Sequence, residues 1–276
     1  MFNNRRTHSQ SVEIVAPQDN WILQRIGDEL AERLSYCRVV EQPSGKTPIG
    51  YYVNYAISPD QRVYEKELAW FTHLEEEDES RVSKFFAIAS KIDVAISQSE
   101  LYSRVLRERI SELRIEVIPP GVDLDRFHLR PIRIGIVGRN YDYTPRKGDH
   151  VLRQVWDIPG IEFVVTGSGW TVPHQYLTET ELPNFYRSLD YLLIPSLWEG
   201  GPMSAIEALA VGVPVIAPPV GWMSELPHLE YPAGDIEALR VVLHECVLKK
   251  QQLRAAVLDR TWDEFARKHD EVFSTL

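Results

Sequence analysis

Two glutamates flank a glycine-rich turn in the segment 196–208, which reads SLWEGGPMSAIEA. Glu199 precedes the turn, and Glu207 lies on the helix that the pattern predicts from Met203 onward. The Gly200-Gly201 pair lets a ligand approach the backbone closely, and the proline after it suits a first helical turn. Carboxylates in such a place can accept hydrogen bonds from vicinal hydroxyl groups. The whole string favours a binding site over two unrelated surface acids.

A group of basic residues follows the predicted strand 132–137. Gly138-Arg139 ends that strand, and Arg146-Lys147-Gly148 stands where a helix is expected to begin. Backbone N–H groups and the helix dipole favour an anion at such a position. Arg139 could hold a pyrophosphate in bidentate fashion and Lys147 could act as a point charge. A solvated basic loop is the alternative interpretation of this motif alone.

The elements that must position these residues are short apolar strands alternating with amphipathic helices. This alternation is typical of parallel α/β architecture. Strands are expected at 12–16, 51–57, 68–72, 94–97, 115–118, 132–137, 161–166, 191–194 and 213–217. Helices are expected at 22–34, 82–90, 100–111, 150–156, 182–188, 203–211, 236–249, 251–258 and 262–273.

The pattern stops once and then restarts. Pro119-Pro120-Gly121 ends the first half, and residues 122–131 are charged and without a regular pattern, which predicts a linker. We therefore expect a domain over 1–127, a second domain over 128–260 and a C-terminal helix over 261–276. Ligands of parallel sheets bind beyond the carboxyl ends of the strands, so the chemistry is expected in a cleft between the two halves.

Composition limits the remaining classes. The chain has 276 residues, 44% hydrophobic and 25% charged, with a net charge of −10, which is unfavourable for binding nucleic acid. Cys37 and Cys246 are the two cysteines, too few for a disulfide framework or a zinc motif. No run is apolar enough to span a bilayer, so we expect a soluble, cytoplasmic protein. A peripheral membrane contact and the oligomeric state stay open.

The segment from Glu199 to Glu207 resembles the E-x7-E motif of family 4 glycosyltransferases. Other segments agree in order and spacing from about Val94 to the C-terminus. They are 118–123 (IPPGVD), Gly138-Arg139, Lys147-Gly148, 165–169 (VTGSG) and 210–217 (AVGVPVIA). The resemblance implies an α/β fold of the GT-B type, with two Rossmann-like parallel α/β domains facing a central cleft. The first would be the acceptor side and the second the nucleotide-sugar side.

The resemblance also implies roles for the charged residues. Arg139 and Lys147, with Gly138 beside them, would neutralise the diphosphate of a nucleotide-sugar donor. Glu207 would hold the ribose hydroxyls, and Glu199 would hold hydroxyls of the donor sugar.

Further roles follow from matched positions. The turn Gly200-Gly201 and the amides of Met203 and Ser204 would line the sugar and phosphate. The loop that begins at Gly167 would lie near the base. His73, after the strand 68–72, stands where the family often has a histidine beside the transferred sugar.

The activity implied is transfer of a sugar from a UDP- or GDP-sugar to a hydroxyl acceptor, with retention, no metal and no prosthetic group. The acceptor could be a glycan, a lipid-linked sugar, a small metabolite or a modified base. Two alternatives stay open: a degenerate nucleotide-sugar-binding or regulatory protein, and an epimerase or phosphorylase on the same fold. A dehydrogenase is disfavoured because no G-x-G-x-x-G follows an early strand.

The chain departs from the family pattern at two loops. Residues 17–21 (PQDNW) replace a Gly-Gly loop; Asp19 and Asn20 could cap the next helix, or Trp21 could form an acceptor platform. Gly200-Gly201-Pro202 replaces Gly-aromatic-Gly, and Pro202 cannot donate an amide. The acidic run 75–79 is expected to be a solvated helix start or loop. The helix 262–273 resembles one that crosses back onto the first domain, where it would couple closure to donor binding.

Overall fold

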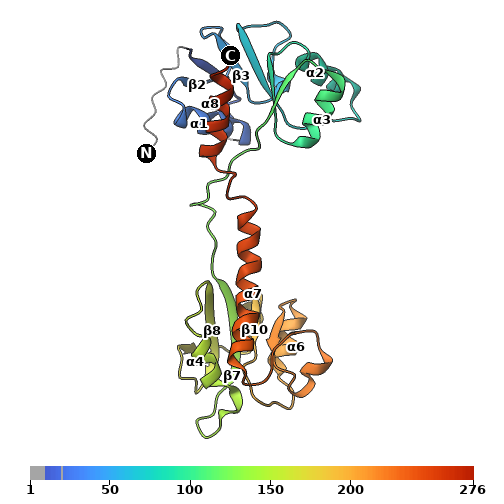
Figure 1. Cartoon of the computed structure of the whole chain (residues 1–276). Coiled ribbons are helices and arrows are strands. Elements are labelled where there is room, and N and C mark those ends of the chain that lie inside the picture. The colour runs from blue at the N-terminus through green and yellow to red at the C-terminus, as the bar shows by residue number, and fades with distance from the viewer. Residues whose placement is uncertain (1–9, 20) are drawn as a thin grey trace. The chain divides into compact units, whose positions relative to one another are not determined.

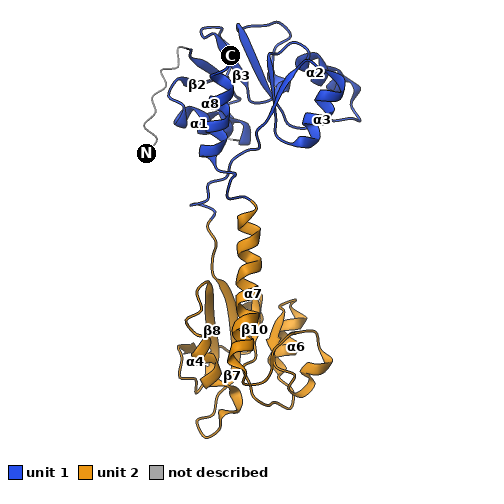
Figure 2. Cartoon of the chain, in the orientation of Figure 1, with its two compact units in different colours: residues 1–127, 257–276 blue, residues 128–256 orange. Residues whose placement is uncertain are grey.

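The computed structural model describes residues 10–19 and 21–276. The chain divides into two compact units, Met1–Phe127 with Val257–Leu276 (unit 1) and His128–Ala256 (unit 2), coloured separately in Figure 2. Each unit holds one six-stranded sheet in which every strand pair is parallel. The prediction of an α/β fold built from two Rossmann-like units is therefore confirmed. None of the helices in the described part is long and apolar enough to cross a membrane.

The sheet of unit 1, in which Figure 1 labels β2 and β3, has the strand order β2-β1-β3-β4-β5-β6. Its strands are β1 (Val12–Val15), β2 (Cys37–Val40), β3 (Ile49–Tyr52), β4 (Lys66–Phe71), β5 (Val94–Ser97) and β6 (Arg114–Val117). Its helices are α1 (Ile22–Arg33), α2 (Glu79–Ala89), α3 (Glu100–Arg109) and α8 (Trp262–Phe273). Strands β1, β4 and β5 are buried almost throughout, as expected of a sheet that is covered on both faces.

Helix α8 returns the chain to unit 1 and completes one of its cores. Trp262, Phe265 and Phe273 are buried together with residues of β1 and β3. On the exposed side, Arg33 of α1 donates to Asp263 at 2.6 Å. The amphipathic pattern predicted this helix with its observed bounds.

A fully buried histidine on α8 makes unit 1 sensitive to acid. His269 Nδ1 lies 2.9 Å from the carbonyl of Phe265 and Nε2 lies 3.1 Å from the Tyr51 hydroxyl. A neutral ring satisfies both contacts, with Nδ1–H donating and Nε2 accepting. Burial lowers the pKa of His269 to about 4, whereas the unfolded chain has a histidine pKa of about 6.5.

Acid should therefore weaken folding between these two pKa values, because only the unfolded state takes up the proton there. We expect the free energy of unfolding to fall by up to about 3 kcal/mol between pH 6.5 and pH 4 through this residue. Guanidinium unfolding at several pH values measures this loss. His269→Gln should flatten that part of the pH dependence, and His244→Gln, an exposed histidine of unit 2, should leave it unchanged. Equal slopes in all three proteins would contradict the assignment.

The sheet of unit 2 has the order β12-β11-β10-β7-β8-β9. Its strands are β7 (Ile132–Arg139), β8 (Ile161–Ser168), β9 (His174–Gln175), β10 (Tyr191–Leu193), β11 (Val215–Ala217) and β12 (Leu229–Glu230). Its helices are α4 (Asp149–Val155), α5 (Leu182–Arg187), α6 (Met203–Ala210) and α7 (Ile236–Ala255). The chain winds from β7 through β8 to β9 on one side, then from β10 to β12 on the other. The direction thus reverses between β7 and β10.

Several elements differ from the sequence prediction. Strands β2, β9 and β12 were not predicted. The predicted strand 51–57 ends at Tyr52, because the Asn54 side chain accepts from Ala56 N and starts a short 3-10 turn. The two helices predicted at 236–249 and 251–258 are one helix, α7, since no glycine or proline interrupts it before Ala255.

Two loops of unit 1 have clear local structure. Asp19 accepts a hydrogen bond from Trp21 N at 3.0 Å, and Trp21, the N-cap of α1, makes no side-chain cap hydrogen bond to the helix. Asn20 lies outside the described residues. In the acidic run, Asp78 accepts from the amides of Ser80 and Arg81 and caps α2, which confirms that the run is a helix start.

Candidate functional site

The basic residues and Glu199 meet beyond the carboxyl ends of β7 and β10 in unit 2, and Glu207 lies on α6, the helix that follows. Arg139 is the last residue of β7, and Glu199 lies in the loop that leads from β10 to α6. This is the point where the winding of the sheet reverses. Ligands of open parallel sheets bind beyond the strand ends at such a switch point. Topology therefore places the candidate site where a doubly wound sheet binds its ligands.

Glycines allow the loops around this point to approach one another. In the β7–β8 pair, Gly138 lies opposite Gly167, whose φ is +131°. A Cβ atom at Gly167 would lie 1.9 Å from the carbonyl oxygen of Gly138. Gly148 (φ +71°) lies equally close to Pro195, since a Cβ there would be 1.9 Å from the Pro195 oxygen. Only glycine fits these two contacts.

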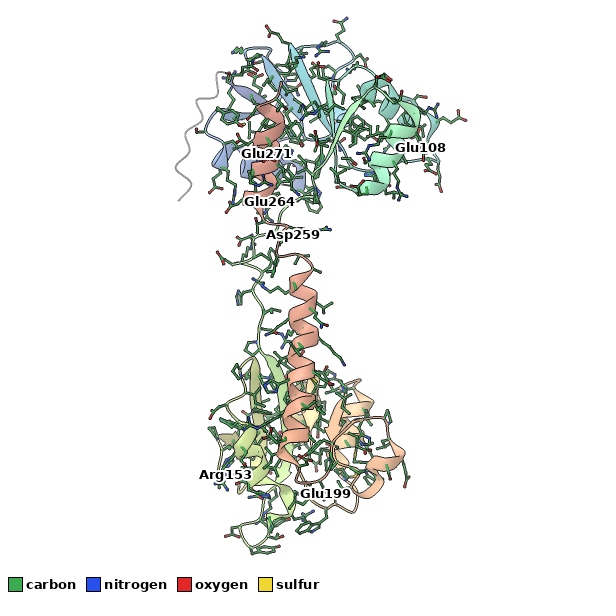
Figure 3. The ribbon with its side chains drawn as sticks, in the orientation of Figure 1. Glu108, Arg153, Glu199, Asp259, Glu264 and Glu271 are labelled. Carbon is green, nitrogen blue, oxygen red and sulfur yellow. The ribbon has the colours of Figure 1, made fainter. Side chains whose placement is uncertain are left out.

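The Gly148 contact brings the basic loop against the glutamate loop. Leu197 N donates to the carbonyl of Arg146 at 2.8 Å. Lys147 Nζ donates to Glu199 Oε1 at 2.5 Å, and Arg146 Nη1 donates to Glu199 Oε2 at 2.6 Å. Ser196 Oγ also donates to Oε1, at 2.9 Å. The Glu199 side chain, labelled in Figure 3, is only 7% exposed and has a hydrogen-bond donor on each oxygen.

Two arginines of the site, Arg139 and Arg146, lie against the same aromatic ring. The guanidinium of Arg139 lies 5.3 Å from the centre of the Tyr141 ring, and that of Arg146 lies 5.7 Å from it. Lys147 Nζ lies close to the backbone of Gly138, 3.7 Å from where a Cβ would stand. Arg139, Arg146 and Lys147 together carry more positive charge than the single carboxylate of Glu199 offsets. This group of residues can therefore hold an anion.

Glu207 has a different partner. The Tyr186 hydroxyl donates to Glu207 Oε2 at 2.5 Å, and the Tyr186 side chain is 2% exposed. Burial, together with the hydrogen bond to Glu207, raises the pKa of Tyr186 well above its ordinary value. The tyrosine therefore stays protonated and orients a half-buried carboxylate. The second oxygen of such a carboxylate can accept from a ligand hydroxyl.

The glycine turn between the glutamates is open on one side and packed on the other. A Cβ at Gly200 would meet no atom within 4 Å, whereas a Cβ at Gly201 would lie 2.5 Å from the Trp222 ring. Met203, which begins α6, is exposed, and no side chain caps the helix after Pro202. The amides of Met203 and Ser204 thus lie at an uncapped helix start, where an anion or a hydroxyl oxygen is favoured.

The loop after β8 is hydrogen-bonded to residues at the end of β7. Trp170 is buried, and its Nε1 donates to the carbonyl of Gly138 at 2.8 Å. Asn140 Nδ2 donates to the carbonyl of Gly169 at 2.8 Å. The loop that begins at Gly167 is therefore fixed by Trp170 and Asn140 next to the basic residues.

His73 belongs to unit 1. It follows β4 and is exposed, with Nδ1 lying 3.1 Å from Thr72 Oγ1 and Nε2 lying 3.3 Å from Glu75 Oε1. It stands at the carboxyl edge of its own sheet, where a ligand group could reach it. Of the residues predicted for the site, His73 is the one that unit 2 does not contain.

Four residues of the site were not predicted as members: Tyr141, Tyr186, Ser196 and Arg146. Tyr141 and Ser196 act through charged neighbours, and Tyr186 precedes Glu207 by twenty-one positions, so spacing gives no signal. Arg146 could have been found, because it adjoins Lys147 and carries the same charge. As for metals, residues 10–19 and 21–276 contain no group of three His, Cys, Asp or Glu side chains that could hold an ion.

The sequence comparisons agree with this geometry. A family model described as "Glycosyl transferases group 1" matches residues 172–228. The lipopolysaccharide core biosynthesis mannosyltransferase LpsB of Rhizobium meliloti is 49% identical over 47 residues, 17% of this chain and 13% of that protein. The D-inositol 3-phosphate glycosyltransferase of Mycobacterium marinum is 31% identical over 152 residues, 42% of this chain and 32% of that protein.

A third relative is the UDP-Gal:alpha-D-GlcNAc-diphosphoundecaprenol alpha-1,3-galactosyltransferase of Escherichia coli. It is 26% identical over 160 residues, 45% of this chain and 40% of that protein. The matched parts thus span well under half the length of each of these relatives.

Among solved structures, HepE of Anabaena, in complex with UDP and glucose, is 13% identical with a TM-score of 0.42, over 98% of this chain and 100% of that one. At that TM-score the two chains do not superpose closely enough for residues to be compared. The segment that matches the glycosyl transferases group 1 model, residues 172–228, includes both glutamates of the candidate site.

Proposed function

We propose that this protein is a glycosyltransferase that moves a sugar from a nucleoside-diphosphate sugar to a hydroxyl acceptor. The observation that carries the proposal is the meeting of three cations with Glu199 at the switch point of unit 2, with Glu207 on the helix that follows. A diphosphate needs the cations, and the hydroxyls of ribose and sugar need the carboxylates. The family match over residues 172–228 supports the same reaction class.

In this proposal the diphosphate is the leaving group. Negative charge develops on it as the sugar–phosphate bond breaks, and preorganised cations that face the developing charge lower the barrier. Arg139 and Lys147 supply the positive charge that stabilises the leaving diphosphate, aided by the amides of Met203 and Ser204. Glu207 holds the ribose and Glu199 the sugar, and the loop from Gly167 lies near the base. The protein's own cations allow the reaction to run without a metal.

The finer features of the reaction are proposals of the same kind. The donor is a UDP- or GDP-sugar, and the anomeric configuration is retained. The acceptor is a glycan, a lipid-linked sugar, a small metabolite or a modified base, reached in the cytoplasm or through a peripheral membrane contact. Unit 1 would supply the acceptor side, with His73 beside the transferred sugar and Trp21, which is exposed, as a platform.

Glu207 gives a sharp test of the ribose assignment. We expect Glu207→Gln to weaken binding of the nucleoside diphosphate about tenfold or more, because a charged acceptor of two hydroxyls is lost. The amide oxygen can still accept from the Tyr186 hydroxyl, so the melting temperature should hold. Glu207→Ala should lower both the nucleotide affinity and the melting temperature, since it leaves the buried Tyr186 hydroxyl without an acceptor. Calorimetric titration measures the affinity. Undiminished binding by Glu207→Gln would remove the ribose assignment.

The proposed reaction is tested by its products. The protein is incubated with UDP-glucose, UDP-galactose and GDP-mannose, with and without an acceptor mixture. The sugar should pass to an acceptor or to water, and the nucleoside diphosphate should be released. A new glycoside identifies a transferase. Free epimerised sugar or sugar phosphate would identify an epimerase or a phosphorylase, and tight donor binding without any product would identify a binding or regulatory protein.

A further inference from the structure

The three cations of the candidate site have unequal partners. Arg146 and Lys147 both donate to Glu199, at 2.6 and 2.5 Å. Arg139 makes no ion pair with any of the described residues and lies over the Tyr141 ring. One nearly buried carboxylate is therefore shared by two of the cations and offsets one of their two charges before any ligand arrives.

We propose that Arg146 is a third anion-binding residue, and that Glu199 is a built-in counter-ion that a diphosphate displaces from Arg146 and Lys147. The inference rests on the proposed function and describes an exchange at the same site. Carboxylate and phosphate oxygens accept from the same guanidinium and ammonium donors, so the two compete. Once displaced, both oxygens of Glu199 become free to accept from sugar hydroxyls.

The geometry of Arg146 supports this role. Its backbone is held, because its carbonyl accepts from Leu197 N at 2.8 Å. Its guanidinium shares the Tyr141 ring with Arg139, so a ligand that meets one arginine is near the other. Only the side chains need to move for the exchange. A diphosphate also relieves the repulsion between the neighbouring cations more fully than a single carboxylate does.

The setting of Glu199 explains why the resting pair forms. A carboxylate that is 7% exposed needs charged partners, because burying an isolated charge is costly. Ser196 holds it in place through Oε1 at 2.9 Å. The same contacts make anion binding weaker than three free cations would allow. The binding of the diphosphate and the release of Glu199 are therefore coupled.

The test is calorimetric titration of the full chain with inorganic pyrophosphate. Glu199→Gln should bind pyrophosphate about fivefold more tightly than the wild type, or better still, because the competing charge is gone. Glu162→Gln is the matched control: it removes one carboxylate from unit 2, where Glu162 pairs with Arg133 near the amino end of β8. Its affinity should equal that of the wild type. Equal or weaker binding by Glu199→Gln would overturn the exchange.

Two further variants keep the test independent of how well Glu199→Gln folds. Glu199→Asp keeps the charge on a shorter side chain that cannot span both cations, and should bind pyrophosphate more tightly than the wild type. Arg146→Gln should lower the affinity more in the Glu199→Gln background than alone, because the counter-ion no longer masks Arg146. Strict additivity, or no binding of pyrophosphate by any of these proteins, would refute the inference.

Titration with UDP and UDP-glucose separates this inference from the proposed function. If the Glu199 variants bind pyrophosphate more tightly but none of the proteins binds a nucleotide, the counter-ion inference stands and the proposed transferase function is contradicted. If the wild type binds a nucleotide but the Glu199 variants do not bind pyrophosphate more tightly, the proposed function stands and the counter-ion inference is contradicted.

Discussion

Lys147→Ala should lower sugar transfer, measured as kcat/KM for the donor, by about tenfold or more, a barrier increase of roughly 1.4 kcal/mol. In the proposed reaction the lysine faces the place where charge develops on the leaving diphosphate, so the loss should fall mainly on kcat. Its removal also leaves Glu199 paired with Arg146 alone. Steady-state kinetics of nucleotide release or transfer over a range of donor concentrations measures the two constants separately.

Two other lysine variants serve as controls for Lys147→Ala. Lys147→Arg keeps the positive charge and should recover part of the activity, although a planar fork does not replace a point charge fully. Lys249→Ala, an exposed residue on α7, removes the same charge outside the site and should behave like the wild type. If Lys147→Ala transfers sugar with unchanged kinetics, the phosphate assignment falls.

Gly167→Ala should destabilise unit 2 by about 3 kcal/mol or more. A Cβ at this position would stand 1.9 Å from the Gly138 oxygen, and the φ of +131° is itself unfavourable for alanine. The obstacle is backbone on the adjacent strand, so the β7–β8 pair would have to separate where Arg139 begins the anion site. Thermal unfolding measures the loss, and the nucleotide affinity should fall with it.

Two other glycines separate the contributions to this effect. Gly212 has a φ of +80° with no atom within 4 Å of a Cβ, so Gly212→Ala should cost only the backbone strain, about 1 to 2 kcal/mol. Gly200→Ala has neither obstacle and should change stability by less than about 0.5 kcal/mol. Equal stabilities of the three variants would show that the close approach of β7 and β8 is wrong.

The sequence predicted the elements that carry a strong apolar pattern. Strand β5 and helix α8 have the predicted bounds, because both are largely or wholly buried on the face that the pattern identifies. The strands that were missed lie at or near sheet edges. Strand β2 has four residues of which only Cys37 is buried, and β9 and β12 have two residues each. Strands β9 and β12 are too short to show a period of two, and β2 is largely unburied, so these three become strands through pairing with a neighbour.

The candidate site was predictable in its residue types and less so in its pairings. The apolar pattern placed Arg139, Lys147 and Glu199 after strands and Glu207 on the next helix, and the topology brings the loops of the first three to one switch point. The salt bridges from Arg146 and Lys147 to Glu199 were not predictable, because they depend on the approach of Gly148 to Pro195. The position of Glu199 in a family motif suggested a sugar ligand, and its resting partners are cations.

The measurement that tests the central claim most directly is a thermal-shift screen of the whole chain with UDP, GDP, ADP, dTDP, CMP and their common sugars. A ligand that binds only the folded state raises the melting temperature by linkage. We expect stabilisation by one nucleoside diphosphate and its sugars, and a clearly smaller stabilisation of Glu207→Gln. No stabilisation by any of these ligands at millimolar concentration would contradict a nucleotide-sugar site in unit 2.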